Sequence, residues 1–384
     1  MKSNVESMVA RPSRSYTTFA LALVAGVLIV GSVAYLTLSP TGKTATATIT
    51  YAPNTTVVVS ANTTTTITYA PNTTTIVSAT NSSAGQLGTW SPTTSYPFPG
   101  GEFSCVSSGG YMYCVGGAND SNSTAPVGDL NNTYFASLSP TGVGTWTQTT
   151  DYPIGIQDQS CITSSSYIYC IGGLVGAPNA IGTASVYYAS LSPSGIGPWS
   201  QTTPIPEAGE ADCMASSGYA YCVRGQFNAT SFLGYSEVYA APLSAGGVGN
   251  WTESGQVPKN PAGCSASGGY GYCFGGGGCP PAGPPFGQCP SSSYYARLSS
   301  SGTGTWDMTT DLPNSGFGVY VTADSYEYYF AGGPYVAHLS ADGIGGWSTT
   351  TPYPGGPAAC VANGLFVYCI GAAVNNVYFS RIST

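Results

Sequence analysis

Three carboxylates occupy equivalent positions in a chain where charged residues are scarce. Glu102, Asp158 and Glu210 each stand three residues before the first cysteine of a Cys-x8-Cys pair. Oxygen ligands of this kind suit calcium, or a polar, cationic or sugar ligand. Arg224 replaces a glycine on the same rim and is a candidate partner for one of these acids. The alternative interpretation is three solvated surface acids and one salt bridge.

The sequence offers few residues for catalysis that depends on histidine. His338 is the only histidine, and the corresponding position in the other copies of the repeat holds Ser, Pro or Arg, which indicates an exposed position. Ser-His-Asp hydrolysis and histidine-ligated metal sites are therefore disfavoured. Glycoside cleavage by paired carboxylates remains an alternative through the same three acids. The sequence leans against an enzyme.

Cysteine usage indicates an oxidising compartment. The chain has twelve cysteines and no CxxC pair, which favours disulfides over a thiolate metal site. One repeat copy carries Val321 and Phe330 where the cysteines are expected. We expect structural bridges within five Cys-x8-Cys hairpins and one loop: Cys105/Cys114, Cys161/Cys170, Cys213/Cys222, Cys264/Cys273, Cys360/Cys369 and Cys279/Cys289.

The cysteine pairs belong to a repeat that also places every tryptophan in register. Each copy has two apolar runs joined by a Ser/Gly turn, then Gly-Gly, a Tyr-containing strand and a Trp strand, so four strands per copy are expected. The spacing between successive tryptophans is 41 to 56 residues. The tryptophans are Trp90, Trp146, Trp199, Trp251, Trp306 and Trp347.

This pattern resembles the kelch family, whose repeat has a hydrophobic strand ending in Gly-Gly, then a spaced Tyr, then Trp. The resemblance covers about Gly85–Thr384 and implies an all-β, six-bladed kelch-like β-propeller. Arg224 and Ala372 replace glycines of the pattern, and the hairpin cysteines are not typical of the family.

The order of the strands predicts how the ring closes. A Trp strand, Gln86–Trp90, precedes the first hairpin, and the chain ends after a third strand. The N-terminal strand should therefore complete the last blade, which removes a sheet edge. Glu102, Asp158 and Glu210 then lie at the start of innermost strands, around the mouth of the central channel. The loops on this upper face are unequal, as expected of a recognition surface.

The N-terminal region is expected to anchor the protein. We divide it into a cytoplasmic N-region (1–16), a transmembrane signal-anchor helix (17–38) and a disordered Thr-rich stalk (39–84). Lys2, Arg11 and Arg14 precede the apolar run, which predicts a single pass with the N-terminus inside and the C-terminal domain extracellular. A cleaved signal peptide and a pilin-like signal are the alternatives.

Potential glycosylation sites support an extracellular location. Asn-x-Ser/Thr sequons are found in the stalk and in the propeller, where attached glycans would shield the upper loops. They begin at Asn54, Asn62, Asn72, Asn81, Asn119, Asn122, Asn131, Asn228 and Asn250.

These features favour a non-enzymatic cell-surface recognition or adhesion protein, with a glycan or surface protein as ligand and with calcium as the one candidate cofactor. A structural surface-coat glycoprotein is the alternative, and a carboxylate-dependent glycan hydrolase is a third. Nucleic acid is not expected as a partner, because the net charge is −8 and only 6% of residues are charged.

Overall fold

The computed structural model describes residues 84–118, 128–224, 236–276, 291–314 and 318–384, and the backbone of three strands before them. The chain divides into two compact units, Met1–Ser82 and Ser83–Thr384. The first contains an antiparallel sheet in the order β1-β2-β3. Its strands are β1 (Ala34–Thr41), β2 (Thr44–Tyr51) and β3 (Thr55–Ser60).

Over these three strands the backbone is paired, where the sequence predicts the end of a helix and an unpaired stalk. The many β-branched Thr and Val residues favour extended backbone. The rest of the expected anchor and stalk, with the sequons at Asn54, Asn62, Asn72 and Asn81, lies outside the described residues. In the part that the structure describes, no helix has the length and apolarity to cross a membrane. The anchor and its orientation stay predictions.

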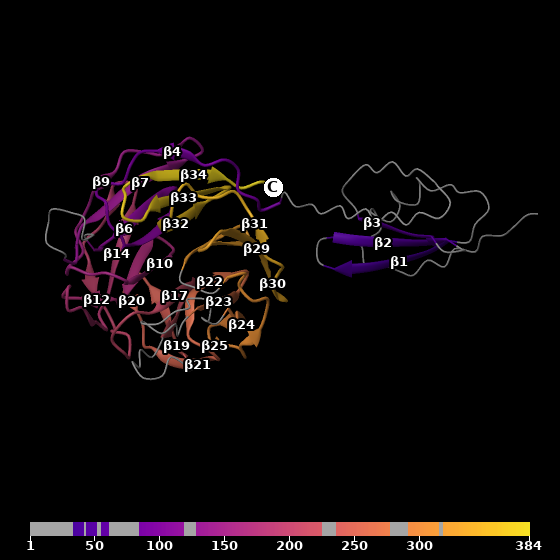
Figure 1. Ribbon diagram of the computed structural model, residues 1–384. Coiled ribbons are helices and arrows are strands. Elements are labelled where there is room, and N and C mark those ends of the chain that lie inside the picture. Colours follow the sequence, from indigo (N-terminus) through magenta and orange to yellow (C-terminus); the bar gives the residue numbers. More distant parts are fainter. Residues whose placement is uncertain are drawn as a thin grey trace, which may run out of the picture. The chain divides into compact units, whose positions relative to one another are not determined.

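The second unit is a β-propeller of six sheets around a central channel (Figure 1). We number these sheets blades 1 to 6 in the order of their first strands. Each first strand contacts the first strands of the two neighbouring blades, so together they surround the channel. The first strands are β5 (Ser104–Ser108), β10 (Ser160–Ser164), β17 (Asp212–Ser216), β22 (Pro261–Ser267), β27 (Val319–Ala323) and β32 (Pro357–Asn363).

Three further antiparallel strands lead outward in each blade. The second strands are β6 (Tyr111–Val115), β11 (Tyr167–Ile171), β18 (Tyr219–Arg224), β23 (Tyr270–Gly276), β28 (Tyr326–Phe330) and β33 (Phe366–Gly371). The third strands are β7 (Thr133–Ser139), β14 (Val186–Ser192), β19 (Ser236–Ser244), β24 (Tyr294–Ser299), β29 (Pro334–Ser340) and β34 (Val377–Arg381). The outermost strands are β9 (Thr147–Gln148), β16 (Ser200–Gln201), β21 (Thr252–Val257), β26 (Asp307–Met308), β31 (Ser348–Thr349) and β4 (Ser91–Thr93).

Short strands complete the connections. Two-residue strands pair with the ends of the third strands of blades 1 to 5: β8 (Gly142–Val143), β15 (Gly195–Ile196), β20 (Gly247–Val248), β25 (Gly302–Thr303) and β30 (Gly343–Ile344). A small hairpin, β12 (Leu174–Val175) with β13 (Ile181–Gly182), lies in the loop after β11.

The ring closes as the sequence predicts. The N-terminal β4 pairs with the C-terminal β34 in blade 6, with Phe379 opposite Ser91. The paired strand begins immediately after Trp90 rather than ending at it, and only Leu87 of the expected Gln86–Trp90 strand forms a bridge, to Ile382. Closure between the two ends of the unit leaves no open sheet edge at the join.

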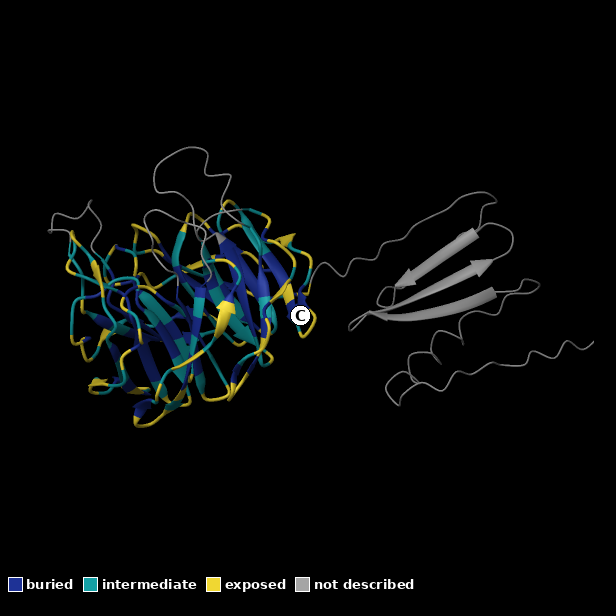
Figure 2. Ribbon diagram, turned by 90° about the horizontal axis from the view of Figure 1, so that it is seen from below, coloured by how far each residue is buried: buried dark blue, intermediate teal, exposed yellow. Residues whose placement is uncertain are grey.

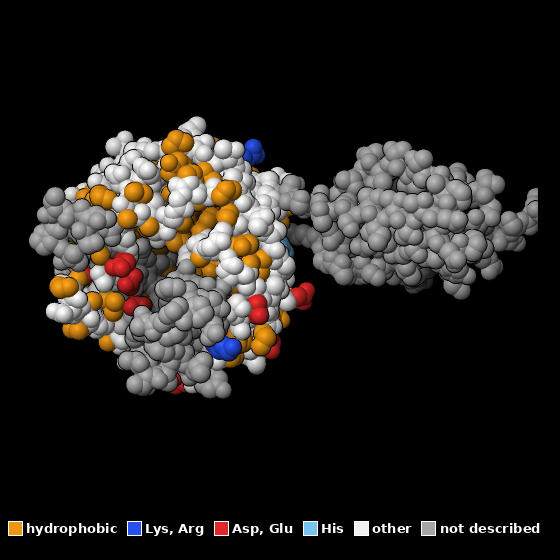
Figure 3. All heavy atoms as spheres, viewed as in Figure 1, with side chains coloured by type: hydrophobic (Ala, Val, Ile, Leu, Met, Phe, Trp, Pro, Cys, Tyr) orange, Lys and Arg blue, Asp and Glu red, His pale blue; other side chains and the backbone are white. Residues whose placement is uncertain are grey.

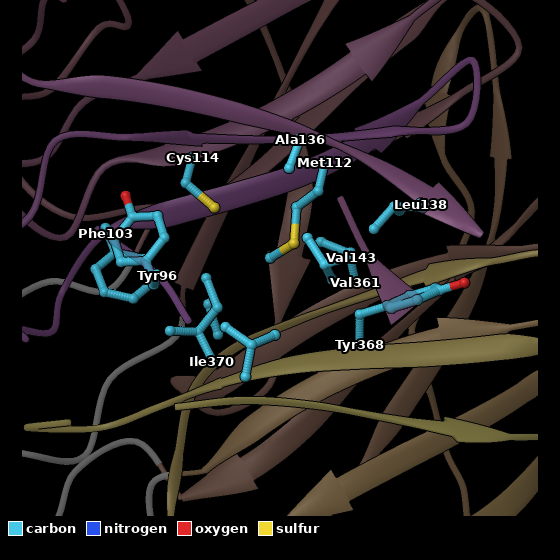
Figure 4. Packing of buried hydrophobic residues seen from close by; sticks show 12 residues of the cluster. Tyr96, Phe103, Met112, Cys114, Ala136, Leu138, Val143, Val361, Tyr368 and Ile370 are labelled. Carbon is cyan, nitrogen blue, oxygen red and sulfur yellow. The ribbon is translucent and has the colours of Figure 1, made fainter. Parts of the chain in front are cut away.

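The core lies between blades, because each sheet is covered by a neighbour on both faces. Figure 4 shows one such layer, in which Met112 and Leu138 of blade 1 pack against Tyr368 and Ile370 of blade 6. In Figure 2 the burial is concentrated along the strands, while many turns are exposed. Two apolar faces per strand explain why the second strands read as nearly continuous apolar runs.

A tyrosine on every second strand also fastens each blade to the next. Tyr113 Oη of blade 1 donates to the Ser192 carbonyl of blade 2 at 2.9 Å. Tyr169, Tyr221 and Tyr272 repeat this bond from blades 2, 3 and 4. Tyr368 of blade 6 donates to Ser139 of blade 1, and Tyr328 of blade 5 donates to Gly85, which precedes β4. The six bonds therefore run around the whole ring.

The five hairpin disulfides are confirmed. In each, the two cysteines lie directly opposite one another on the first and second strands, as Cys161 and Cys170 do. The bridges are Cys105–Cys114, Cys161–Cys170, Cys213–Cys222, Cys264–Cys273 and Cys360–Cys369. The predicted Cys279–Cys289 bridge lies outside the described residues.

In blade 5 the expected replacement of the cysteines is off by one residue. Tyr320 and Tyr329 are paired at the cysteine positions, not Val321 and Phe330. Ala331 adds a residue between the strand and Gly-Gly, so counting back from the glycines shifts the register. Counting from the two-residue turn, where Asp324 and Ser325 have φ of 42° and 69°, would have given the correct pair.

Candidate functional site at the channel mouth

The six first strands enclose a cavity of about 320 Å³ along the channel. Residues of all six strands line it, among them Val106, Thr163, Ser265 and Tyr320. Its size is at the lower end for a small-molecule site, roughly 300 Å³ upward. The central channel of the propeller thus has a mouth, where the first strands begin, and an interior lined by these strands.

Glu102 and Asp158 stand at the mouth in the same unusual conformation. Their φ values are 60° and 53°, in the left-handed region that non-glycine residues rarely adopt. The Asp158 amide donates to the Glu102 carbonyl at 2.9 Å, which links the starts of two neighbouring blades. Glu210 follows Gly209, and in this third blade it is the glycine that has the positive φ, at 121°.

The three predicted acids act on one another electrostatically. The pKa of Asp158 is raised to about 7, first by burial and then by the charges of Glu102, Glu210 and Asp212 in that order. Burial and then Glu102 also raise the pKa of Glu210. Figure 3 shows acidic side chains gathered beside the central hollow of one face. That the three acids meet on one ligand at the mouth stays a prediction.

Asp212 is a fourth acid that the sequence analysis missed. Burial, followed by the charge of Glu210, raises the pKa of Asp212 to about 7. It lies two residues after Glu210 at the start of β17. Residues two apart on a strand share a face, and that spacing was the available signal.

Gln157 and Asp129 extend the mouth toward the loops and were also missed. With its amide oriented to satisfy both neighbours, Gln157 donates to Glu102 Oε2 and Asp129 Oδ1, both at 3.1 Å. The other Asp129 oxygen accepts from the Gly176 amide at 2.5 Å and the Ala177 amide at 3.1 Å. These contacts fix the Glu102 carboxylate relative to the loop after β11.

Arg224, predicted as a rim partner for an acid, acts on Glu210, whose raised pKa its charge lowers in part, and also binds the backbone. Its side chain is buried and donates from Nη1 to the Gly209 carbonyl at 2.9 Å and from Nη2 to the Ala208 carbonyl at 2.5 Å. Burial lowers the pKa of Arg224, whereas Glu207 and other nearby groups, including Glu210, raise it. Arg224 therefore holds the segment that leads into Glu210.

The remaining site predictions have mixed outcomes. His338 is exposed on β29, as expected. Asn131 and Asn250 are exposed, whereas Asn119, Asn122 and Asn228 lie outside the described residues. Among the described side chains, no group of three or more His, Cys, Asp or Glu is arranged to hold a metal ion. Calcium binding stays a prediction.

Comparisons with known proteins support the architecture. No family model matches the chain, and no curated protein matches it. A solved structure titled "Structure of YjhT" is similar, with a TM-score of 0.53 and 12% sequence identity. The match covers 75% of this chain and 95% of that one. At this identity the likeness shows the fold alone, a six-bladed propeller. Membership of the kelch family stays a prediction.

Proposed function

We propose that the protein recognises a cationic or hydroxyl-rich ligand, such as a surface glycan, at the channel mouth on the outside of the cell. The observation that carries this proposal is that the charges of Glu102, Glu210 and Asp212 act on Asp158, so that acids of three successive blades are coupled. Mutual repulsion of such groups costs folding energy unless a ligand or proton offsets it. The hairpin disulfides support an oxidising, extracellular setting.

Backbone strain at the mouth supports a role in binding. Left-handed conformations at Glu102 and Asp158 cost about 1 kcal/mol or more each and are held here by the hydrogen bond between the two residues. Contacts from Gln157 to Glu102 and from Arg224 to the segment before Glu210 fix the acids further. Side chains fixed in this way lose little entropy when a ligand binds.

An array of glycans and cell-envelope extracts tests the proposal. The full-length protein is compared with a variant carrying Glu102→Gln, Asp158→Asn and Glu210→Gln, with and without calcium. A matched control carries Asp307→Asn, Asp311→Asn and Asp342→Asn, which changes three exposed acids elsewhere. We expect saturable binding that only the mouth variant loses. Binding by neither the wild type nor the control would favour a structural coat.

A glycan hydrolase is the second candidate, and the raised pKa of Asp158 favours it. A carboxyl group with a pKa of about 7 is protonated often enough near neutral pH to act as a general acid. An array glycan that binds would be incubated with the protein and its products followed by mass spectrometry. Turnover abolished by Asp158→Asn alone would establish hydrolysis, and intact glycan would dismiss it.

A further inference from the structure

One buried residue departs from the repeat. Glu327, on the second strand of blade 5, has no exposed surface. Its register partner on the first strand is Thr322. The equivalent residues in the other blades are all uncharged: Met112, Ile168, Ala220, Gly271 and Val367. A carboxyl group in this core position is costly and calls for a partner.

The partners that Glu327 has are at the channel wall. Ser265 of blade 4 donates to Glu327 Oε2 at 2.8 Å, and Thr322 donates to the same oxygen at 2.6 Å. Both hydroxyl-bearing residues line the channel cavity. The second oxygen, Oε1, is buried and has no hydrogen-bond partner among the described residues. Half of the carboxyl group is thus unsatisfied directly behind the wall.

Tyr320 adds a buried polar group to the same wall. The Tyr320 ring fills the space beside Gly263 of blade 4, where an added Cβ would approach the ring to 2.5 Å. Its hydroxyl is buried, and it forms a side-chain hydrogen bond with Tyr329 of the same blade. Tyr329, Asp212 and Glu327 all interact electrostatically with it. The wall formed by blades 3, 4 and 5 therefore carries acids beside a buried phenol.

These groups lie deeper in the channel than the acids of the mouth, so acidic groups extend from the mouth into the channel. Glu210 lies two residues before Asp212, the first residue of β17 in blade 3, so the two are at most about 7 Å apart along the chain. Thr322, next to Glu327, lies three strand positions deeper than Asp212 in the repeat register, roughly another 10 Å. Arg224 is the nearby cation among the described residues, and two of its donors are used by backbone carbonyls.

We propose that the channel takes a small linear polyamine, with one ammonium group among the acids of the mouth and another beside Ser265, Thr322 and Glu327. This inference rests on the proposed function and specifies the ligand of the same site. A chain of methylenes between two charges matches acids spread along a channel, and it passes the apolar residues Val106, Ile162 and Val361 on the opposite wall. The ammonium groups would supply the positive charge that the wall lacks.

Calorimetric titration of the full-length protein with spermidine tests the inference, with fully N-acetylated spermidine as the uncharged probe. We expect the wild type to bind spermidine and not the acetylated form. Glu327→Met introduces the residue type that blade 1 has at the equivalent position, Met112. This substitution should weaken spermidine binding at least tenfold. Asp307→Asn, which removes an exposed acid on β26, should bind as the wild type does.

The variant is chosen so that loss of folding does not imitate loss of binding. Met at position 327 restores an apolar residue to an apolar layer, so its unfolding temperature at pH 7 should equal or exceed that of the wild type. A second variant, Asp212→Asn, should weaken spermidine binding without touching that layer. Failure of the wild type to bind spermidine, or undiminished binding by Glu327→Met, would overturn the polyamine inference. Array binding lost in the mouth variant would leave the proposed function standing in either case.

Discussion

Blade 2 joins its two inner strands with the Cys161–Cys170 bridge, whereas blade 5 places Tyr320 and Tyr329 at the same two positions. The tyrosine rings stack with centroids 5.0 Å apart, and Phe274 of blade 4 stacks on the other side of Tyr320 at 4.9 Å. A covalent bond within one blade is thus exchanged for an aromatic stack across two blades. The comparison teaches that the register of the hairpin does not depend on the bridge.

The exchange also changes the chemistry of the channel. A disulfide offers no strong donor or acceptor, whereas Tyr320, which lines the cavity, carries a buried hydroxyl group. Blade 5 in addition carries the buried Glu327 at a position where blade 2 has Ile168. The blade without a bridge therefore also carries a fully buried carboxyl group on its second strand.

The largest expected effect comes from breaking the stack. Tyr329→Ala removes a fully buried ring from the layer between blades 4 and 5 and should lower the free energy of unfolding by about 3–5 kcal/mol. Equilibrium denaturation in urea would measure it. Tyr329→Phe keeps the ring and serves as the control. A loss below about 1 kcal/mol would mean that the stack does not replace the bridge.

The second-largest expected effect is the pH dependence of stability that blade 5 introduces. Burial raises the pKa of Glu327 to about 7 from 4.5, and its bonds to Thr322 and Ser265 offset part of that rise. A raised pKa means that the folded state holds the proton more tightly. Stability from this group is therefore complete below about pH 4.5 and declines as the pH rises toward 7, by about 3 kcal/mol in total.

Thermal unfolding between pH 4 and 8 would measure this decline. Glu327→Met should flatten the curve and leave a smaller slope from Asp158 and Asp212, whose pKa values are raised in the same direction. A wild-type protein that becomes more stable from pH 5 to 7 would contradict the assignment.

Removing a bridge from blade 2 should cost less. Cys161→Ala with Cys170→Ala opens a short loop within a hairpin that the Ser165 turn already favours. We expect a loss of about 2 kcal/mol, measured by denaturation in urea. The same measurement on the wild type with and without reductant is the control. A much larger loss would show that blade 2, unlike blade 5, needs its covalent bond to hold register.

The last expected effect, from converting blade 5 to the pattern of blade 2, is measured by bridge formation rather than by stability. Tyr320→Cys with Tyr329→Cys should form a sixth hairpin bridge, because these residues are directly opposite. Thiol titration and mass spectrometry would detect it. Val321→Cys with Phe330→Cys is the matched control and should stay reduced, since those residues face Tyr328 and Val319 instead. Bridging in the control alone would contradict the register.

Much of the fold is readable in the sequence because it is periodic. Six registered tryptophans and five cysteine pairs predict the number of blades, the hairpin register and the closing strand, since each copy repeats one local pattern. Glu102, Asp158 and Glu210 were found in the same way. Gln157 was missed because its partners, Glu102 and Asp129, come from another blade, and local spacing does not encode them. Asp212 was missed although its spacing from Glu210 was a local signal.

The sequence by itself determined the blades and their covalent pairs, because hairpin turns, alternating apolar residues and opposed cysteines act over about ten residues. Only the tertiary structure decided that Arg224 is buried against the Ala208 and Gly209 carbonyls. It also decided that Tyr320 fills the space beside Gly263 and that Glu327 bonds to Ser265 of another blade. The physical reason is that these contacts form when neighbouring sheets pack face to face, and the residues involved are distant in the chain.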